Sequence, residues 1–231
     1  HLLFISTPEA EDSMVNLRHL FAFGKSAQAT LVESHVTLGG SNYFKNIVTE
    51  VKMDANSHAD HYVIQREAED AQHISALYLH EDRDSHFRSH TIDFGGSLVR
   101  HNIWAYLDGE NCDATLNGMY MLRGNQHVDN FMWVEHMKEN VPSHELYKGI
   151  LDDKSSAVFS GRLYVHQEAQ KTDAKQTNQN LLLSDDAKVN TKPQLEIYAD
   201  DVKCTHGATI GQLDKLAHFY LMSRGIDKTV A

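Results

Sequence analysis

The chain has 231 residues, of which 41% are hydrophobic and 23% are charged, and this composition is that of an ordinary soluble protein with one sizeable core. No run of about 18 apolar residues could span a bilayer, so no membrane partner is expected. The 32 acidic and 21 basic side chains leave a net charge of −11, which repels phosphate backbones and argues against nucleic acid as a partner.

Short runs that alternate apolar and polar residues recur along the chain and predict β-strands. A run begins about every 11 to 15 residues, a spacing that suits a β-sandwich, a barrel or a β-solenoid. The three prolines and thirteen glycines provide few sharp corners, which favours a solenoid because its turns can pass through Asn, Asp, Ser and Thr. The predicted strands are 47–51, 62–65, 75–79, 90–94, 102–107, 114–122, 130–134, 157–165, 180–183, 195–198 and 202–205.

Polar stretches separate some of these strands, and residues 152–156, 167–179 and 184–193 are expected to be turns or loops. Gln176, Asn178 and Asn180 recur at every second position near the end of one such stretch. Their amides either stack into hydrogen-bonded ladders on successive turns of a coil or belong to a plain polar loop. The residues alone leave both alternatives open.

The pattern changes from strand to helix after Gly211. Five apolar residues then fall on one helical face, with Asp214 in the first turn, Arg224 near the end and Gly225 at the stop. This pattern predicts an amphipathic helix, and we expect its apolar stripe to cover the exposed end of the coil. The stripe consists of Leu213, Leu216, Ala217, Tyr220 and Leu221.

Cys204 and His206 are the first candidates for chemistry. Alternation along an extended strand places them on one face, roughly 7 Å apart, so both could approach one iron or sulfur atom. In the other interpretation, which the residues alone favour, Cys204 is a small buried apolar residue and His206 a hydrogen-bonded imidazole. Cys112 lies far from Cys204 without a pairing pattern, so reduced thiols in a cytoplasmic protein are expected.

The chain contains sixteen histidines. The segments His58–His61 and His86–His90, with their neighbouring aspartates, would supply metal ligands on a helix, but we expect solvated loops there. His127 and His136 are expected on the outer face of strands. No nucleophile elbow, P-loop, His-Glu-x-x-His or dinucleotide fingerprint is present, so a self-sufficient enzyme and a bound flavin are not expected.

Six motifs in the second half of the chain follow one another in a fixed order: Tyr147–Leu151, Val158–Arg162, Ala169–Ser184, Lys192–Thr209, Gly211–Asp214 and Ser223–Ile226. In this order they resemble the SufD subunits of the SUF iron–sulfur cluster assembly machinery. The resemblance implies an all-β fold, a right-handed parallel β-helix (solenoid) with a short C-terminal amphipathic helix. It also implies that helical segments flank the core, so the chain is expected to be a core fragment.

The same resemblance implies a function. A SufD-like chain is a non-catalytic scaffold that pairs with SufB through the β-helix and with the SufC ATPase through the C-terminal helical region. His206 and Cys204 would then be cluster-assembly residues at the SufB interface and transient ligands of iron or a cluster, with no cofactor held tightly. Leu213, Leu216, Tyr220 and Leu221 would contact SufC.

Two domains are predicted, a β-helix core over residues 1–211 and the start of a helical region over 212–231. An isolated core is expected to form a homodimer where its open edge has no SufB. The alternative function is a stand-alone β-helix enzyme that acts on carbohydrate or depends on a metal. Its only support is analogy with other parallel β-helix proteins, because adjacent carboxylates such as Asp152 and Asp153 would point in opposite directions in a strand.

Overall fold

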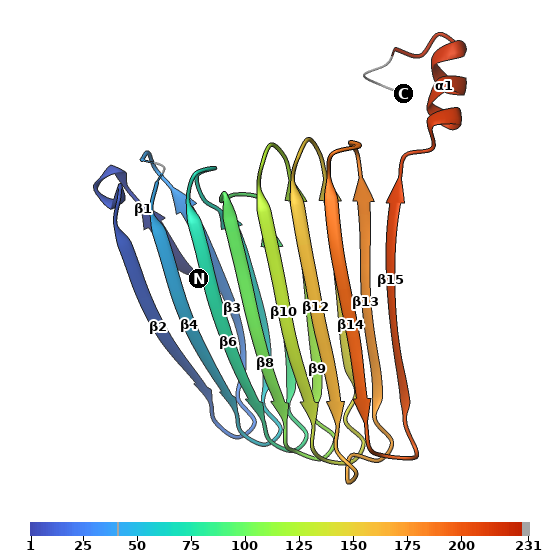
Figure 1. Ribbon diagram of the computed structural model, residues 1–231. Helices are drawn as coiled ribbons and strands as arrows, with labels where there is room; N and C mark the ends of the chain where they lie inside the picture. Colours follow the sequence, from blue (N-terminus) through green and yellow to red (C-terminus); the bar gives the residue numbers. More distant parts are fainter. Residues whose placement is uncertain (41, 228–231) are drawn as a thin grey trace.

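The computed structural model describes residues 1–40 and 42–227, and in it the chain winds into a solenoid of parallel β-strands followed by one α-helix (Figure 1). The strands are β1 Leu2–Ser6, β2 Met14–Phe23, β3 Gln28–Thr37, β4 Phe44–Met53, β5 His58–Arg66, β6 Gln72–Glu81, β7 His86–Asp93, β8 Leu98–Leu107, β9 Asp113–Leu122, β10 His127–His136, β11 Ser143–Leu151, β12 Ser156–Val165, β13 Asp173–Leu182, β14 Lys188–Ile197 and β15 Lys203–Gln212. A 3-10 turn covers Pro8–Ala10, and α1 is Lys215–Ser223.

Odd and even strands belong to different sheets. The eight odd strands form one sheet in the order β1-β3-β5-β7-β9-β11-β13-β15, and the seven even strands form the other in the order β14-β12-β10-β8-β6-β4-β2. Each turn therefore adds one strand to each sheet, and the two sheets face each other across the core (Figure 1). This arrangement confirms the predicted parallel solenoid.

The alternation of side chains explains why these segments form strands. In β8, β10 and β12 every second residue is buried and the residues between them are half-buried. Because the register is in step from turn to turn, buried side chains of neighbouring strands stack in rows along the solenoid. The largest fully buried side chains are Tyr120, Tyr147, Phe87, Phe159, Met53, Leu79, Leu107, Leu116, Met132, Leu151, Leu163 and His35.

Each corner that leads from an even strand to the next odd strand, from β2–β3 to β12–β13, contains one residue with a left-handed backbone. These residues are mostly Asn or Asp, whose short polar side chains tolerate that conformation. Their φ angles lie between 57° and 61°. The left-handed position of these corners is therefore occupied without glycine, and the residues are Ser26, Asn56, Asp84, Asn111, Asn140 and Lys171.

Several segments that the sequence predicts as loops are strands. His58–His61 opens β5, His86–His90 lies in β7, and the polar stretches 167–179 and 184–193 run into β13 and β14. Strands β1, β2, β3 and β11 were not predicted. The loop predictions were wrong because these segments carry polar residues on both the inward and the outward face of the strand. Their sequences therefore do not alternate between apolar and polar residues.

The amides of β13 are buried but do not form a ladder between turns. Asn180 donates to the Asn178 side-chain oxygen at 2.7 Å, and Asn178 donates to the Tyr120 hydroxyl at 3.3 Å. The rows explain this, because Asn178 has Tyr147 and Ala208 as its neighbours on adjacent turns, and neither is an amide. Neither of the two alternatives describes these amides, because they lie on a strand and bond within β13 and to tyrosine.

Helix α1 ends where the sequence predicts but begins at Lys215, so Leu213 and Asp214 precede it and do not lie in its first turn. Asp214 caps it by accepting hydrogen bonds from the backbone of Leu216 and Ala217, and Gly225 follows it with φ +84°. The helix lies beyond the end of β15 and away from both sheets, so the prediction that it covers the end of the coil was wrong (Figure 1). No helix in the described part of the chain is long and apolar enough to cross a membrane. Residues 228–231 of the predicted helical region lie outside the described residues.

Candidate functional site

Cys204 and His206 lie on β15, the last strand of the odd sheet. In the register, Cys204 neighbours buried Ala174 and His206 neighbours buried Gln176, so both side chains are on the inner face of the sheet. No further turn covers this face among the described residues, which leaves Cys204 half-buried and His206 exposed. The structure thus confirms the shared face and places the pair at the open end of the solenoid.

The row that contains His206 continues into the core as polar residues. Glu145 on β11 and Gln176 on β13 are its inner neighbours, and each is 1% exposed. Neither side chain has a hydrogen-bond partner among the described residues. Burial raises the pKa of Glu145 to about 8, so its carboxyl is largely neutral at pH 7.

The Cys204 thiol is protonated at neutral pH. Burial raises its pKa, and the charge of Asp173 adds to the effect. A bound metal ion would displace the proton, because a thiolate is the form that ligates metals. Within the described residues, no three His, Cys, Asp or Glu side chains are arranged to hold a metal ion. Cys204 and His206 are therefore at most two ligands of a larger set.

The predicted SufC-contact residues are all exposed. Leu213, Leu216 and Tyr220 are 57%, 79% and 57% exposed, and Leu221 is 37% exposed. A helix that presents this much apolar surface and packs on neither sheet has a face available for another element.

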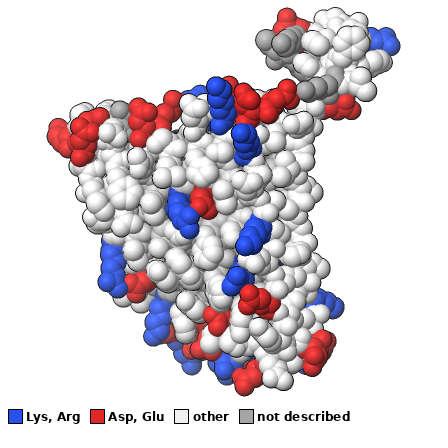
Figure 2. All heavy atoms as spheres, in the orientation of Figure 1, with Lys and Arg blue, Asp and Glu red and all other residues white. Residues whose placement is uncertain are grey.

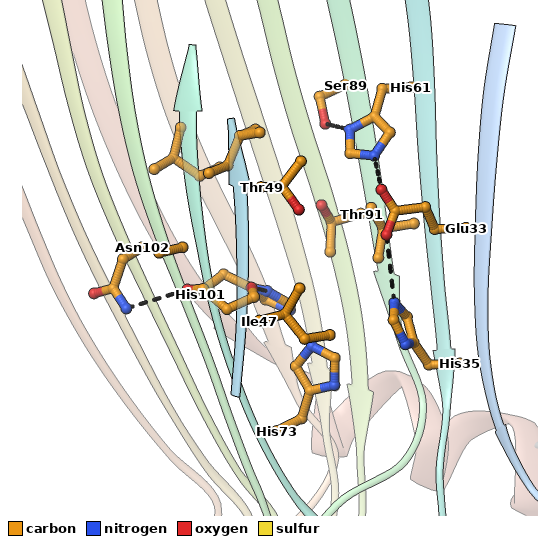
Figure 3. Close-up of a pocket in the computed structure, with 15 residues that line it drawn as sticks. Glu33, His35, Ile47, Thr49, His61, His73, Ser89, Thr91, His101 and Asn102 are labelled. Atoms are coloured by element: carbon orange, nitrogen blue, oxygen red, sulfur yellow. Dashed lines mark hydrogen bonds and ion pairs between the residues drawn. The ribbon is translucent and has the colours of Figure 1, made fainter. Parts of the chain in front are cut away.

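A second cluster of polar residues lies inside the first turns of the solenoid, and the sequence reading missed it (Figure 3). Glu33 is 2% exposed, and the His61 ring donates from Nε2 to its Oε1 at 2.9 Å. The other ring nitrogen of His61 then accepts from the Ser89 hydroxyl at 3.2 Å. His35 Nε2 lies 3.7 Å from the second Glu33 oxygen. One buried carboxylate thus holds two imidazoles on opposite sides.

Glu67 is the second buried carboxylate of this region. Lys45 Nζ lies 2.5 Å from one oxygen, and His73 Nδ1 lies 2.7 Å from the other. The Tyr43 hydroxyl also donates to it, at 3.1 Å. Burial opposes ionisation of Glu67, but these donors outweigh it and lower its pKa. Burial lowers the pKa of His73 despite this contact, so His73 donates as a neutral imidazole.

A cavity of about 40 Å³ lies between these groups. It has room for about two or three water molecules, and its histidine, serine and threonine lining offers the polar partners that buried water needs. Most of its titratable groups already pair with one another, which identifies the cluster as an internal polar layer of the fold. The alternation rule could have found it, because its histidines lie on the inner face of their strands: His35, His61, His73 and His101.

The remaining histidine predictions had mixed outcomes. His127 is half-buried on the outer face, where its ring contacts the Ser156 hydroxyl at 2.7 Å. His136 is fully buried, so its predicted surface position was wrong. Burial lowers the pKa of His136 to about 4, which keeps the ring neutral in the core.

Comparison with known proteins agrees with this architecture. A family model for the SUF system FeS cluster assembly, SufBD core domain, matches residues 4–231. The chain is 40% identical over 94% of its length to the iron–sulfur cluster assembly protein SufD of Escherichia coli, and covers 52% of that protein. It is 36% identical over 98% of its length to a SufBD family protein of Synechocystis, again covering 52%. The chain spans about half the length of these relatives and belongs to the SufBD family of iron–sulfur cluster assembly proteins.

Proposed function

We propose that this chain is the core of a non-catalytic scaffold subunit of the SUF complex, which pairs with SufB and the SufC ATPase in the cytoplasm. The observation that best supports this function is the position of Cys204 and His206 on the inner face of the terminal strand β15. A thiol and an imidazole suit iron–sulfur chemistry, and a site with few permanent ligands can release its cargo.

The two sheet edges support pairing with another chain. Among the described residues, β14 and β15 each have a neighbouring strand on one side only. Unpaired strand edges recruit further strands, and a partner solenoid would extend both sheets at once. SufB would bring the ligands that Cys204 and His206 lack into the same junction.

The apolar face of α1 supports the second contact. Leu213, Leu216, Tyr220 and Leu221 are exposed on or beside a helix that stands clear of the sheets. Docking of this helix on SufC would bury that face, and ATP-driven movement of SufC could then reach the junction through β15. The stand-alone carbohydrate-active or metal-dependent enzyme loses its support, because family membership accounts for the fold.

The test is cluster assembly by the full-length protein reconstituted with SufB, SufC, iron and a sulfide source. We expect His206→Ala to depress the rate of cluster formation strongly and Cys204→Ser to depress it less, while both variants keep the wild-type fold by circular dichroism. His144→Ala is the matched control, because His144 is exposed on β11 and faces outward. A normal rate in the His206→Ala complex would remove this residue from the assembly site.

A further inference from the structure

The outer face of the even sheet carries a band of aromatic side chains. Both tryptophans of the chain lie in it. The rings of Tyr78 and Trp104 stack with centroids 4.8 Å apart, and Phe131 follows at 5.7 Å. Figure 2 shows this face, on which uncharged side chains cover most of the area, a few charged ones stand among them, and more charged ones gather at the two ends of the strands. Aromatic residues and Arg are enriched at protein interfaces, and both kinds of side chain occur in this band.

The band continues to the edge strand β14 as a ladder. The Trp133 and Tyr164 rings stack at 5.8 Å, and the next ring, Tyr198, lies 5.3 Å from Tyr164. Tyr198 directly follows Ile197, the last residue of β14, and its backbone N–H donates to the Val165 oxygen at 2.9 Å. The register pairs Tyr164 with Glu196, so the line of rings runs diagonally across the strands and ends at Tyr198, just beyond β14.

The guanidinium group of Arg162 packs beside these rings. Arg162 lies over the Trp133 ring at 5.2 Å and contacts Glu196 at 3.3 Å and Gln194 at 3.5 Å. Arg162 of β12 therefore fixes the positions of the Glu196 and Gln194 side chains of the edge strand β14 in the unbound protein. Preorganised groups of this kind lose little entropy on binding.

The last rung differs from the others in exposure. Trp133 and Tyr164 are half-buried because a neighbouring rung covers part of each ring, whereas Tyr198 is 57% exposed. Strands repeat at about 4.8 Å, so a partner strand that pairs with β14 and extends past Ile197 would place a side chain over this ring.

We propose that Tyr198 anchors the partner solenoid at the edge of the even sheet, and that a flat side chain of the partner's edge strand, aromatic or guanidinium, stacks on its ring. This inference rests on the proposed pairing with SufB and names the residue of this chain that contributes most to it. A ring already packs on Tyr198 from its inner side, at Tyr164, and a guanidinium packs on the Trp133 ring, so both kinds of flat side chain occur on this face. Tyr is one of the residue types most enriched among the hot spots of binding energy.

The occupant is an extended strand because the contact is continuous with the unpaired edge of β14. A strand there satisfies the backbone groups of the edge and covers Tyr198 in one step. A small molecule on the aromatic band would cover the rings but leave the edge open.

The experiment measures the affinity of the full-length protein for purified SufB by titration calorimetry. We expect Tyr198→Ala to weaken the complex by about tenfold or more, and Tyr198→Phe, which keeps the ring, to bind as the wild type does. Tyr78→Ala is the matched control, since Tyr78 is a stacked ring on the same face, 39% exposed, but on β6 and far from the edge. It is expected to leave the affinity unchanged.

The outcomes separate the two proposals. If the wild-type protein does not bind SufB, the proposed pairing fails and this anchor fails with it. If the wild type binds and Tyr198→Ala binds equally well, the pairing stands and the anchor is overturned. An equal loss in Tyr78→Ala and Tyr198→Ala, or a loss in Tyr198→Phe as large as that in Tyr198→Ala, would also overturn it.

Discussion

His101 Nε2 lies 3.0 Å from Oδ1 of Asp93, and the two side chains come from opposite sheets of the solenoid. Asp93 ends β7 and His101 lies in β8, so the pair joins the sheets across the core. Burial alone would lower the pKa of His101, but the charge of Asp93 and the hydrogen bond to it raise the pKa above its ordinary value. The ion pair of Asp93 and His101 thus links the two sheets inside a core that is otherwise mostly apolar.

Replacing Asp93 by Asn should weaken the fold in a way that depends on pH. A histidine whose pKa is raised in the folded state adds stability below its unfolded pKa, about 6.5, and that stability is lost as pH rises through the folded value. We expect Asp93→Asn to lower the free energy of unfolding by about 1 to 3 kcal/mol near pH 5.5 and by less near pH 9. Urea denaturation at both pH values measures this.

The control for this change is Asp108→Asn. Asp108 faces His80 at 3.7 Å, but both side chains are substantially exposed to solvent. Exposed pairs contribute little, so the control should change the unfolding free energy by less than about 1 kcal/mol at either pH. A pH-independent loss in Asp93→Asn would show that the charge of His101 is not involved.

Glu33 should contribute to stability through its ionised form. Burial raises its pKa, but the hydrogen bonds with His35 and His61 outweigh this and lower the pKa to about 2. A carboxyl group whose pKa is lowered in the folded state stabilises the fold at pH values above its unfolded pKa. This stabilisation is lost as the pH falls towards 2. We expect Glu33→Gln to cost about 3 kcal/mol at pH 7 and much less near pH 2.5, measured by chemical denaturation. An equal cost at both pH values would contradict this account.

Glu145→Gln should have the opposite effect, which makes it the counterpart of Glu33→Gln. Because burial raises the Glu145 pKa to about 8, the folded state keeps a proton that the unfolded state releases above about pH 4.5. The wild-type protein therefore loses stability as the pH rises from about 4.5 to 8, whereas the Glu145→Gln variant, which has no ionisable group at this position, does not. We expect the variant to be more stable by up to about 3 kcal/mol at pH 7 and to gain little at pH 4. A gain that is the same at both pH values would assign the effect to packing.

Gly161→Ala tests how tightly the two sheets meet. A Cβ at Gly161 would collide with the amide of Gln176 on the facing sheet, whereas a Cβ at Gly207 on β15 would have no atom within 4 Å. We expect Gly161→Ala to destabilise the fold by about 1 to 3 kcal/mol through overpacking and Gly207→Ala to be neutral or slightly stabilising. Thermal unfolding of the two variants side by side decides this, and equal melting temperatures would show that Gln176 moves aside freely.

Much of the solenoid could be predicted from local patterns. Alternation located the strands that are apolar on their inner face, as in Asn102–Leu107 of β8 and Ala157–Val165 of β12. The scarcity of glycine, together with Asn and Asp between the strands, indicated corners such as Asn111 and Asn140. The helix and its stop at Gly225 were also predicted, because helix ends depend on a few adjacent residues, although Asp214 was expected in the first turn and is the N-cap.

The candidate site was predictable only in part. The two-residue spacing placed Cys204 and His206 on one face, but spacing does not say whether that face is inner or outer. The inward row from His206 through Gln176 to Glu145 depends on which residues of separate turns stand in register. The buried carboxylate Glu33 was missed altogether, because its strand mixes polar and apolar residues on the face that points inward.

The sequence by itself determined the strand-by-strand alternation, the corners, the helix ends and the motifs that are similar to SufD, since each depends on residues close together in the chain. Only the tertiary structure decided which polar side chains are buried, that α1 stands clear of the coil, and that Tyr198 ends an aromatic ladder at an open edge. The physical reason is that turns about 30 residues apart stack in register, so a side chain's surroundings come from the turns on either side and not from its neighbours in the sequence.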